Sequence, residues 1–382
     1  MTSLGVAHSF EVWLPLTMTW AYNQVRLAPE IEAIVLAGRT ENLEAFPWRP
    51  LYVPTSAVDR LRLAAADKAR RRAYPLSWGK AVRHHRPQVL HSHFGYRGWR
   101  DVPLARRFDL PHAVTFYGHD VTMFPQRWPV WRRRYVELFA AADLFLCEGP
   151  YMKASLVAQG CPEAKVQVQR LGVELDRLPC VPREAPADGV VRILMAGAFR
   201  EKKGMPLALA AVARLRPGYD VRVTVIGDAG PAADEQAEKR RILEVVEREG
   251  LGDVVDFLGF TPYERLIEEA YRHHIFLSPS LVAADGDCEG GAPVVITEMA
   301  ASGMPVASST HCDIPEVVVD GVTGVLAPEG DLEALAARLE ELCSAPELWA
   351  AMGRAARSHV EELFDVRRCT AALAARYREL AR

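Results

Sequence analysis

Basic residues gather in a short segment that can bind phosphate groups. Residues 197–204 read GAFREKKG and carry three cations, Arg200, Lys202 and Lys203. The segment follows an apolar run at 190–195, which we expect to be a strand, and it precedes an expected helix. A loop that leads into a helix offers backbone N–H groups and the positive end of the helix dipole. Together with the cations this favours a diphosphate ligand, although a solvated basic turn gives the same pattern.

An acidic loop with paired glycines forms a second candidate site. Residues 285–298 follow an expected strand at 275–277. Glycine permits close approach of a ligand to the backbone, and a helix expected from about residue 294 presents its N-terminus there. Glu298 can accept hydrogen bonds from ribose hydroxyls, and Glu289 is placed to meet a sugar. An N-capping acid and an ordinary helical glutamate give the same pattern. The loop residues expected to contact the ligand are Gly290, Gly291, Ala292, Pro293 and Val294.

A third group of candidates lies in the first half of the chain. His119 and Asp120 follow an expected strand at 113–116. A histidine there can hydrogen-bond a transferred sugar or the charge on a leaving group, or it can satisfy a loop carbonyl. We expect His91 and His93 to point to opposite faces of their strand and take His93, nearer its end, as the candidate. No acid–base pair has the spacing of metal ligands.

Strands and helices alternate along the chain and must position these residues. Helical periodicity covers 131–142, 235–249, 332–343 and 350–380, and the segment 179–189 is typical of a linker. This alternation predicts parallel sheets with flanking helices. The expected strands are 34–36, 89–91, 113–116, 144–147, 190–195, 221–226, 254–258, 275–277, 305–308 and 324–326.

The pattern as a whole predicts an α/β protein with two Rossmann-like doubly wound domains facing across a cleft. Such folds bind ligands at the carboxyl ends of their strands. We place an N-terminal domain at 1–185 and a C-terminal domain at 186–360. A final helix at 361–382 is expected to cross back to the first domain.

The composition of the chain indicates what kinds of partner it can bind and in which cellular compartment it works. The chain has 382 residues and a net charge of −3, but residues 1–185 hold 25 Lys and Arg against 17 Asp and Glu. The seven cysteines are scattered without CxxC spacing, which argues against a disulfide framework or a zinc cluster and for a reducing compartment. We expect a cytoplasmic protein, since neither a signal-peptide pattern nor a membrane-spanning apolar run is present.

The segment 127–135 mixes aromatic and basic residues, and Arg70, Arg71 and Arg72 add a second basic cluster. These segments fit peripheral contact with the inner face of an anionic membrane or with a pyrophosphate-linked lipid. A solvated basic surface fits equally well. The charge would also suit nucleic acid, but no nucleic-acid-binding module accompanies it, and we expect no such partner.

The ordered motifs in residues 190–330 resemble the retaining glycosyltransferases of family 4, which have the GT-B fold. That family carries a G-R-x-x-x-x-K-G loop, then E-G-x-G, and a second glutamate eight positions after the first. Here Lys203 holds the lysine position, Ala198 replaces the arginine, and Glu289 and Glu298 are nine positions apart. Further landmarks are IGD at 226–228, FLGF at 257–260, LSPS at 277–280 and DGVTG at 320–324.

The first half is similar to family members that build exopolysaccharides, of the colanic-acid type. The segments that carry this resemblance are LPLTMTW at 14–20, HSHFG at 91–95 and TFYGHD at 115–120. Tyr117 stands where relatives often have histidine. The resemblance implies that Thr19, His93 and Tyr117 lie on the acceptor side.

The resemblance implies transfer of a hexose-type sugar from a UDP- or GDP-sugar to an acceptor hydroxyl, with retention, in exopolysaccharide or other glycoconjugate synthesis. The acceptor would be a glycan, a lipid-linked sugar or a small molecule, and catalysis would require neither a cofactor nor a metal. The domain at 1–185 would bind the acceptor, and the domain at 186–360 would bind the nucleotide sugar. Arg200 and Lys203 would bind the diphosphate, and Phe260 would flank the base. The residues implied to be catalytic are His119, Asp120, Lys203 and Glu289.

Two other functions remain open at the level of sequence. A sugar-nucleotide epimerase would use the same fold, and Ala198 and Tyr117 would suit a catalytically inactive nucleotide-sugar-binding protein. A nicotinamide-dependent oxidoreductase is disfavoured because no G-x-G-x-x-G follows a strand.

Overall fold

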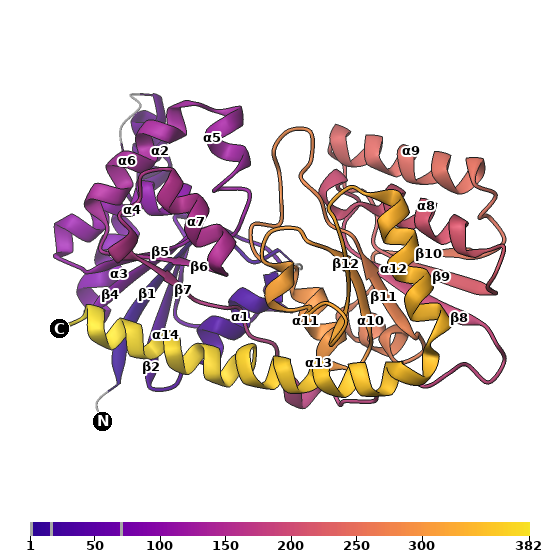
Figure 1. Cartoon of the computed structure of the whole chain (residues 1–382). Helices are drawn as coiled ribbons and strands as arrows, with labels where there is room; N and C mark the ends of the chain where they lie inside the picture. The colour runs from indigo at the N-terminus through magenta and orange to yellow at the C-terminus, as the bar shows by residue number, and fades with distance from the viewer. Residues whose placement is uncertain (1–2, 16–17, 69–71) are drawn as a thin grey trace. The chain divides into compact units, whose positions relative to one another are not determined.

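The chain divides into two compact units. The computed structural model describes residues 3–15, 18–68 and 72–382, shown in Figure 1. One unit comprises Met1–Gly172 and Val366–Arg382, and the other comprises Val173–Asp365. The boundary expected after residue 185 thus lies inside the second unit. Leu16 and Thr17 of the LPLTMTW segment and two arginines of the basic cluster, Arg70 and Arg71, lie outside the described residues.

The first unit is a parallel sheet with helices packed around it. The strand order is β3-β2-β1-β4-β5-β6-β7, and neighbouring strands pair in parallel. The strands are β1 (Leu4–Trp13), β2 (Ile31–Thr40), β3 (Leu51–Tyr52), β4 (Val89–His93), β5 (His112–Thr115), β6 (Leu144–Cys147) and β7 (Val166–Val168). The helices are α1 (Thr19–Arg26), α2 (Ala57–Lys68), α3 (Leu76–His85), α4 (Gly95–Phe108), α5 (Met123–Arg127), α6 (Val130–Ala141), α7 (Pro150–Ala158) and α14 (Val366–Leu380).

The second unit repeats this architecture with the strand order β10-β9-β8-β11-β12-β13, again in parallel pairs. Its strands are β8 (Val191–Ala196), β9 (Val221–Ile226), β10 (Val255–Gly259), β11 (Ile275–Ser278), β12 (Val306–Ser309) and β13 (Gly324–Ala327). Its helices are α8 (Met205–Leu215), α9 (Ala233–Arg248), α10 (Tyr263–Ala270), α11 (Val294–Ala301), α12 (Leu332–Ser344) and α13 (Trp349–Leu363).

Burial explains why short apolar runs become the strands. In β6, β11, β12 and β13 every residue is buried, as expected for parallel strands covered on both faces by helices. In a hydrophobic core of the second unit, the strand residues Ile193 and Val223 pack with Leu209 of α8 and Leu339 of α12. The prediction of two doubly wound α/β domains is confirmed.

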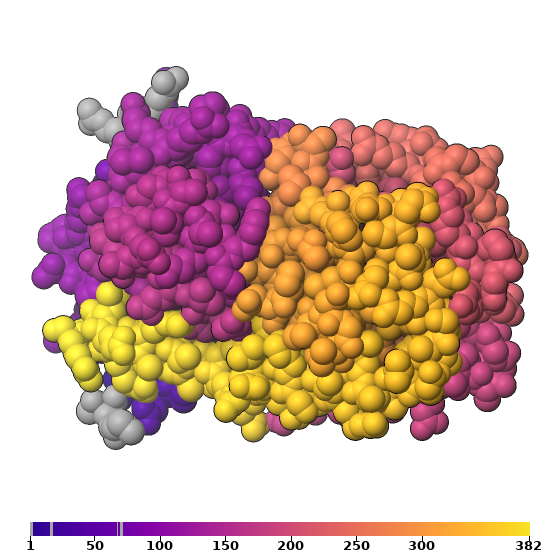
Figure 2. All heavy atoms as spheres, in the orientation of Figure 1, coloured from indigo at the N-terminus to yellow at the C-terminus, as the bar shows by residue number. Residues whose placement is uncertain are grey.

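The C-terminal helical stretch is two helices rather than one. Helix α13 ends at Leu363, and the backbone of Phe364 and Asp365 pairs with Val173. Helix α14 then packs on the first unit, where the Thr370 hydroxyl donates to the Leu27 carbonyl at 3.1 Å. Figure 2 shows this yellow segment against the purple and magenta atoms of that unit.

The segment 179–189 has the irregular backbone expected of a linker, but it does not join the units. It belongs to the second unit, where the buried Arg183 guanidinium donates to the carbonyls of His273 and Ser302 at 2.8 and 3.0 Å. The linker interpretation is therefore wrong, because hydrogen bonds from one buried arginine anchor the segment.

Candidate functional site

The predicted donor-side residues gather at the carboxyl edge of the second sheet. The segment 197–204 follows β8, Phe260 follows β10, and the loop 279–293 follows β11. Because β8 lies between β9 and β11 in a parallel sheet, the loops after these strands emerge at one edge. In open parallel sheets that edge is where ligands bind.

Lys203 and Glu289 form the centre of this donor-side cluster. The Lys203 ammonium lies 2.8 Å from Glu289 Oε1, and the Ser280 hydroxyl donates to the same oxygen at 3.0 Å. Burial alone would raise the pKa of Glu289, but the charges of Lys203 and Lys202 hold it at about 2. Glu289 is therefore ionised at neutral pH, and the structure brings the two predicted residues into direct contact.

Lys202 and Asp287 hold the two loops together. The Lys202 ammonium lies 3.2 Å from Asp287 Oδ1 and donates to the Cys288 carbonyl at 3.0 Å. The Leu281 amide donates to the Lys202 carbonyl at 2.9 Å. Arg200 Nη1 is 3.7 Å from Asp287 Oδ2, and the arginine remains largely exposed. The sequence indicates that Lys202 adds positive charge to the loop but does not show that its partner is Asp287.

The backbone around Lys203 depends on Gly204. Its φ is +62°, and a Cβ at this position would lie 2.1 Å from the Pro279 carbonyl oxygen. Only glycine fits this left-handed conformation against the neighbouring loop. Gly204 immediately precedes helix α8, so it fixes the direction in which Lys203 leaves the turn.

A histidine that the sequence did not single out anchors Glu289. The Glu289 amide donates to His311 Nε2 at 3.2 Å, and His311 Nδ1 lies 2.7 Å from Glu329 Oε2. The second oxygen of Glu329 accepts the Val282 amide at 2.7 Å. These residues come from loops after β11, β12 and β13, so adjacent strands rather than adjacent sequence bring them together.

Glu298 is buried on α11 and shares a hydrogen bond with Tyr263. The tyrosine hydroxyl donates to Glu298 Oε1 at 2.9 Å. Burial raises the pKa of Glu298 to about 7, and the Tyr263 hydrogen bond opposes that shift only in part. The Arg177 guanidinium lies over the Tyr263 ring, 5.2 Å from its centroid. Tyr263 was missed because an isolated tyrosine at a helix start carries no sequence signal.

The remaining donor-side residues lie on the loop and on the sheet edge. Gly290 has a φ of +74°, and α11 begins at Val294 after Pro293. The first turn of such a helix has backbone N–H groups without intrahelical acceptors. Gly291 and Pro293 are buried, whereas Ala292 is half-buried. Phe260 is 65% exposed, so its ring offers a flat apolar face at the same edge of the sheet.

The predicted acceptor-side residues gather at the carboxyl edge of the first sheet. The Tyr117 ring lies 4.4 Å from that of Trp20, which follows Thr19 in the first turn of α1. His119 is half-buried, and its ring lies 5.1 Å from Phe94. The structure thus places Tyr117 and His119 in one loop, with Thr19 on the neighbouring helix.

Asp120 has a positioning role in this structure. Its side chain is fully buried, and its two oxygens accept the Gly95 and Tyr117 amides at 2.7 and 3.0 Å. The catalytic role predicted for it does not fit this geometry, because both carboxylate oxygens already hold the backbone that carries Tyr117.

His93 lies behind the surface rather than on it. It is fully buried between His8 and Tyr117, with ring nitrogens 3.1 Å from His8 Nδ1 and 2.6 Å from the Tyr117 hydroxyl. The expectation that His91 and His93 point to opposite faces is wrong, since residues two apart in a strand share a face. Their ring centroids are 4.2 Å apart. His93 therefore contacts Tyr117, and through it the predicted acceptor side, from within the core.

Three buried histidines could together hold a metal, and most of their ring nitrogens already have partners, although His8 Nε2 has none among the described residues. His8, His91 and His93 each offer a ring nitrogen within 4.8 Å of the others. His91 already contacts Tyr377 and Thr115, both at 2.6 Å. A metal here would break hydrogen bonds that tie α14 and β5 to the centre of the sheet.

The aromatic and basic segment 127–135 is only partly packed: Trp131 and Tyr135 are buried, whereas residues 127–130, 132 and 133 are exposed. The Arg134 guanidinium lies over the rings of Trp99 and Trp131, and Arg132 Nε donates to the Pro125 carbonyl at 3.0 Å. Trp128 remains 42% exposed. Throughout the described ranges, every helix is too short or too polar to cross a bilayer. Membrane contact stays a prediction.

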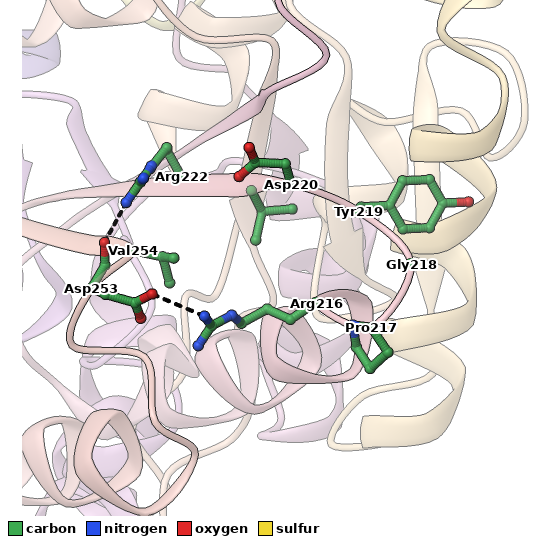
Figure 3. Close-up of a pocket in the computed structure, with 9 residues that line it drawn as sticks. Arg216, Pro217, Gly218, Tyr219, Asp220, Arg222, Asp253 and Val254 are labelled. Atoms are coloured by element: carbon green, nitrogen blue, oxygen red, sulfur yellow. Dashed lines mark hydrogen bonds and ion pairs between the residues drawn. The ribbon is translucent and has the colours of Figure 1, made fainter.

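A surface hollow of about 410 Å³ lies at the opposite edge of the second sheet, where β9 begins. Figure 3 shows its lining, in which Arg216 donates to Asp253 at 3.0 Å and Arg222 donates to the Asp253 carbonyl. None of the predicted site residues lines it. We place no ligand there, because its arginines already have protein partners.

Two family models match this chain. A model described as "Glycosyl transferases group 1" matches residues 182–359, and one described as "Glycosyltransferase Family 4" matches residues 26–177. Between them they cover most of both units.

Curated relatives agree with these models. An amylovoran biosynthesis glycosyltransferase of Erwinia amylovora is 36% identical over 282 residues, covering 72% of this chain and 65% of the relative. A putative colanic acid biosynthesis glycosyltransferase of Escherichia coli K12 is 34% identical over 267 residues, covering 68% of this chain and 63% of the relative. The matches thus span somewhat less than two thirds of these relatives' length.

Solved structures share the fold at low sequence identity. Sucrose-phosphate synthase from Thermosynechococcus elongatus superposes with a TM-score of 0.76 at 19% identity, covering 99% of each chain. Anabaena HepE, solved in complex with UDP, gives a TM-score of 0.79 at 16% identity, covering 98% of this chain and 100% of its own. The fold is GT-B, and the chain belongs to the glycosyltransferases that the group 1 and family 4 models describe.

Proposed function

We propose that the chain transfers a hexose-type sugar from a UDP- or GDP-sugar to an acceptor hydroxyl, with retention of configuration, in the synthesis of an exopolysaccharide or related glycoconjugate. The observation that carries this proposal is the contact between Lys203 and Glu289 at the carboxyl edge of the second sheet. A cation for phosphate and an ionised carboxylate for sugar hydroxyls lie side by side where such sheets bind nucleotides.

On this proposal the second unit binds the donor. Lys203 and Arg200 would neutralise charge that develops on the leaving diphosphate, with backbone N–H groups of residues 290–294 assisting. Because these cations supply the positive charge, we propose that catalysis requires no metal ion. Glu289 would hold the sugar hydroxyls. Glu298 would accept hydrogen bonds from the ribose, and the exposed Phe260 ring would stack on the base.

The first unit would bind the acceptor, which we propose to be a glycan, a lipid-linked sugar or a small molecule. His119 is the candidate to contact the transferred sugar, since it is a half-buried imidazole on the loop after β5. Tyr117 and Thr19 would shape the acceptor surface. Asp120 and His93 would position Tyr117 from behind.

Product analysis of donor turnover tests the proposal. The full chain is incubated with UDP- and GDP-hexoses, with and without lipid and glycan extracts, and sugar transfer is followed by mass spectrometry and the anomeric configuration by NMR. UDP-sugars come first, because the HepE fold neighbour was solved with UDP. We expect Lys203→Ala to lower turnover by about 100- to 1,000-fold, the usual loss when one group that stabilises negative charge in the transition state is removed.

Lys153→Ala in the first unit is the matched control and should retain wild-type turnover. Conversion of one sugar nucleotide into its epimer would replace the proposal with an epimerase. Nucleotide binding without any turnover, across the whole acceptor panel, would favour a catalytically inactive binding protein.

A further inference from the structure

Cys288 in the donor-side loop after β11 meets the neighbouring residues His311 and Cys312 from the loop after β12. One ligand atom from each of the three lies within 4.8 Å of the others. Cys288 and His311 are buried and Cys312 is half-buried. The proposed function uses none of these three side chains for chemistry.

The atoms of this cluster are already directed at one another. His311 Nε2 lies 3.1 Å from Cys312 Sγ, and the two thiols are hydrogen-bonded. Tetrahedral zinc with Zn–S of about 2.3 Å and Zn–N of about 2.0 Å places its ligand atoms about 3.3–3.8 Å from one another. The cluster therefore needs only small side-chain movements to surround an ion.

A carboxylate stands behind the histidine, as it does in many zinc sites. Glu329 Oε2 lies 2.7 Å from His311 Nδ1, and Glu329 Oε1 accepts the Val282 amide. With Nδ1–H donating to Glu329, the lone pair of Nε2 faces the thiols. Such carboxylate–histidine pairs set the tautomer and ring orientation of metal-ligating histidines.

We propose that Cys288, His311 and Cys312 form a binding site for one thiophilic ion of the Zn²⁺ class. Two sulfur ligands and one imidazole favour such an ion over Mg²⁺ or Ca²⁺, which prefer oxygen. Three protein ligands leave a fourth position for water or another small ligand. The ion would clip the loop after β11 to the loop after β12, independently of the proposed transfer reaction.

The bound ion would also affect the neighbouring acid. His311 Nε2 accepts the Glu289 amide at 3.2 Å, and the same lone pair would coordinate the metal. Binding therefore has to weaken that hydrogen bond. If the proposed function holds, a bound metal would therefore alter how Glu289 is held in the donor site. Metal binding itself requires neither sugar donor nor acceptor.

Metal titration of the reduced, full chain tests this site. Zn²⁺ is added in competition with a chromophoric chelator, and Co²⁺ is used for its thiolate-to-metal charge-transfer absorption. We expect one ion per chain, a charge-transfer band, and affinity lowered by more than about 100-fold in Cys288→Ser and Cys312→Ser. Glu329→Gln should lower the metal affinity by about 10- to 100-fold, the usual effect of losing a carboxylate that hydrogen-bonds to a metal-ligating histidine.

Cys343→Ser and His84→Gln are matched controls outside the cluster and should bind as the wild type does. X-ray absorption of the zinc-loaded wild type needs no variant and should show two sulfur neighbours at about 2.3 Å. Undiminished binding in a Cys288→Ser/Cys312→Ser double variant, or a zinc shell without sulfur, would overturn the proposal. Absence of tight binding by the reduced wild type would overturn it equally.

Discussion

At the scale of single residues, two glutamates on one loop-and-helix segment have opposite electrostatic environments. Glu289 faces two ammonium groups and has a pKa of about 2, whereas Glu298 is buried beside a neutral tyrosine and has a pKa of about 7. One carboxylate is permanently charged at neutral pH, and the other is close to its midpoint. Only the second can make ligand binding depend on pH in the physiological range.

Donor affinity is therefore expected to depend on the ionisation of Glu298. An ionised carboxylate accepts hydrogen bonds from ribose better than a protonated one, so affinity should rise with pH and level off above pH 7. Below the pKa, affinity should fall by up to about tenfold per pH unit, the limit for a protonated acid that does not bind ribose. Calorimetric titration between pH 6 and 8.5 measures this. A nucleotide-diphosphate sugar is used because it has no phosphate that titrates near pH 6.

Glu298→Gln should bind more weakly than the wild type at high pH and show a flat pH profile. The control Glu347→Gln, at an exposed position, should keep the wild-type profile. A pH-dependent affinity that survives in Glu298→Gln would assign the titration to another group.

Residue types and spacing predicted the charged members of the site but not their supports. Lys203, Glu289 and Glu298 stand out because charges and glycines flank expected strands and helices. His311 and Tyr263 do not, since their importance comes from contacts made after folding. Burial also changed the predicted role of Asp120, because sequence shows a carboxylate but not which amides it will meet.

At the scale of elements, the turn from β8 into α8 depends on a close backbone approach. Gly204 adopts a left-handed conformation with its α-carbon against the Pro279 carbonyl, so one turn and one loop are packed without space for a side chain. The predicted strands around this turn are confirmed because fully buried parallel strands read as unbroken apolar runs. Strand β1 was not predicted, since His8, Ser9 and Glu11 interrupt its apolar pattern.

Gly204→Ala is expected to destabilise the second unit by about 2–5 kcal/mol, from the left-handed backbone and the clash with Pro279. Hydrogen–deuterium exchange of β8 and β11 amides, followed by mass spectrometry, reports on this unit separately. Gly252→Ala is the matched control, because a Cβ there has no atom within 4 Å, and it should change stability by less than about 0.5 kcal/mol. Equal exchange in the two variants would refute the packing argument.

At the scale of the whole molecule, the first unit has a core of neutral histidines. His8, His91, His93 and His112 are fully buried, and burial lowers the pKa of each, to about 3 for His8 and about 4 for His112. The C-terminal helix α14 closes this core, since Tyr377 contacts His91. The sequence predicts a final helix from residue 361, whereas α14 begins at Val366, because the backbone of Phe364 and Asp365 pairs with Val173.

This core should make the first unit sensitive to acid. Between the folded and unfolded pKa values the unfolded chain binds more protons, so stability is retained above about pH 6.5 and falls below it. Between pH 7.5 and pH 5.5, each such histidine should lower the free energy of unfolding by about 1.4 kcal/mol. Urea unfolding followed by tryptophan fluorescence measures the loss, because seven of the eight tryptophans belong to this unit.

A urea midpoint that is constant across this range would contradict the assignment of these histidines as neutral. His84→Gln, at an exposed position, should leave the pH dependence unchanged.

The central claim is that the carboxyl edge of the second sheet binds a nucleotide diphosphate through Lys203. Isothermal titration of UDP and GDP into the full chain, wild type beside Lys203→Ala and Lys153→Ala, tests it most directly. We predict saturable binding of one diphosphate per chain, weakened about 10- to 100-fold in Lys203→Ala and unchanged in Lys153→Ala. No binding of either nucleotide, or equal affinity in Lys203→Ala, would contradict this account of the donor site.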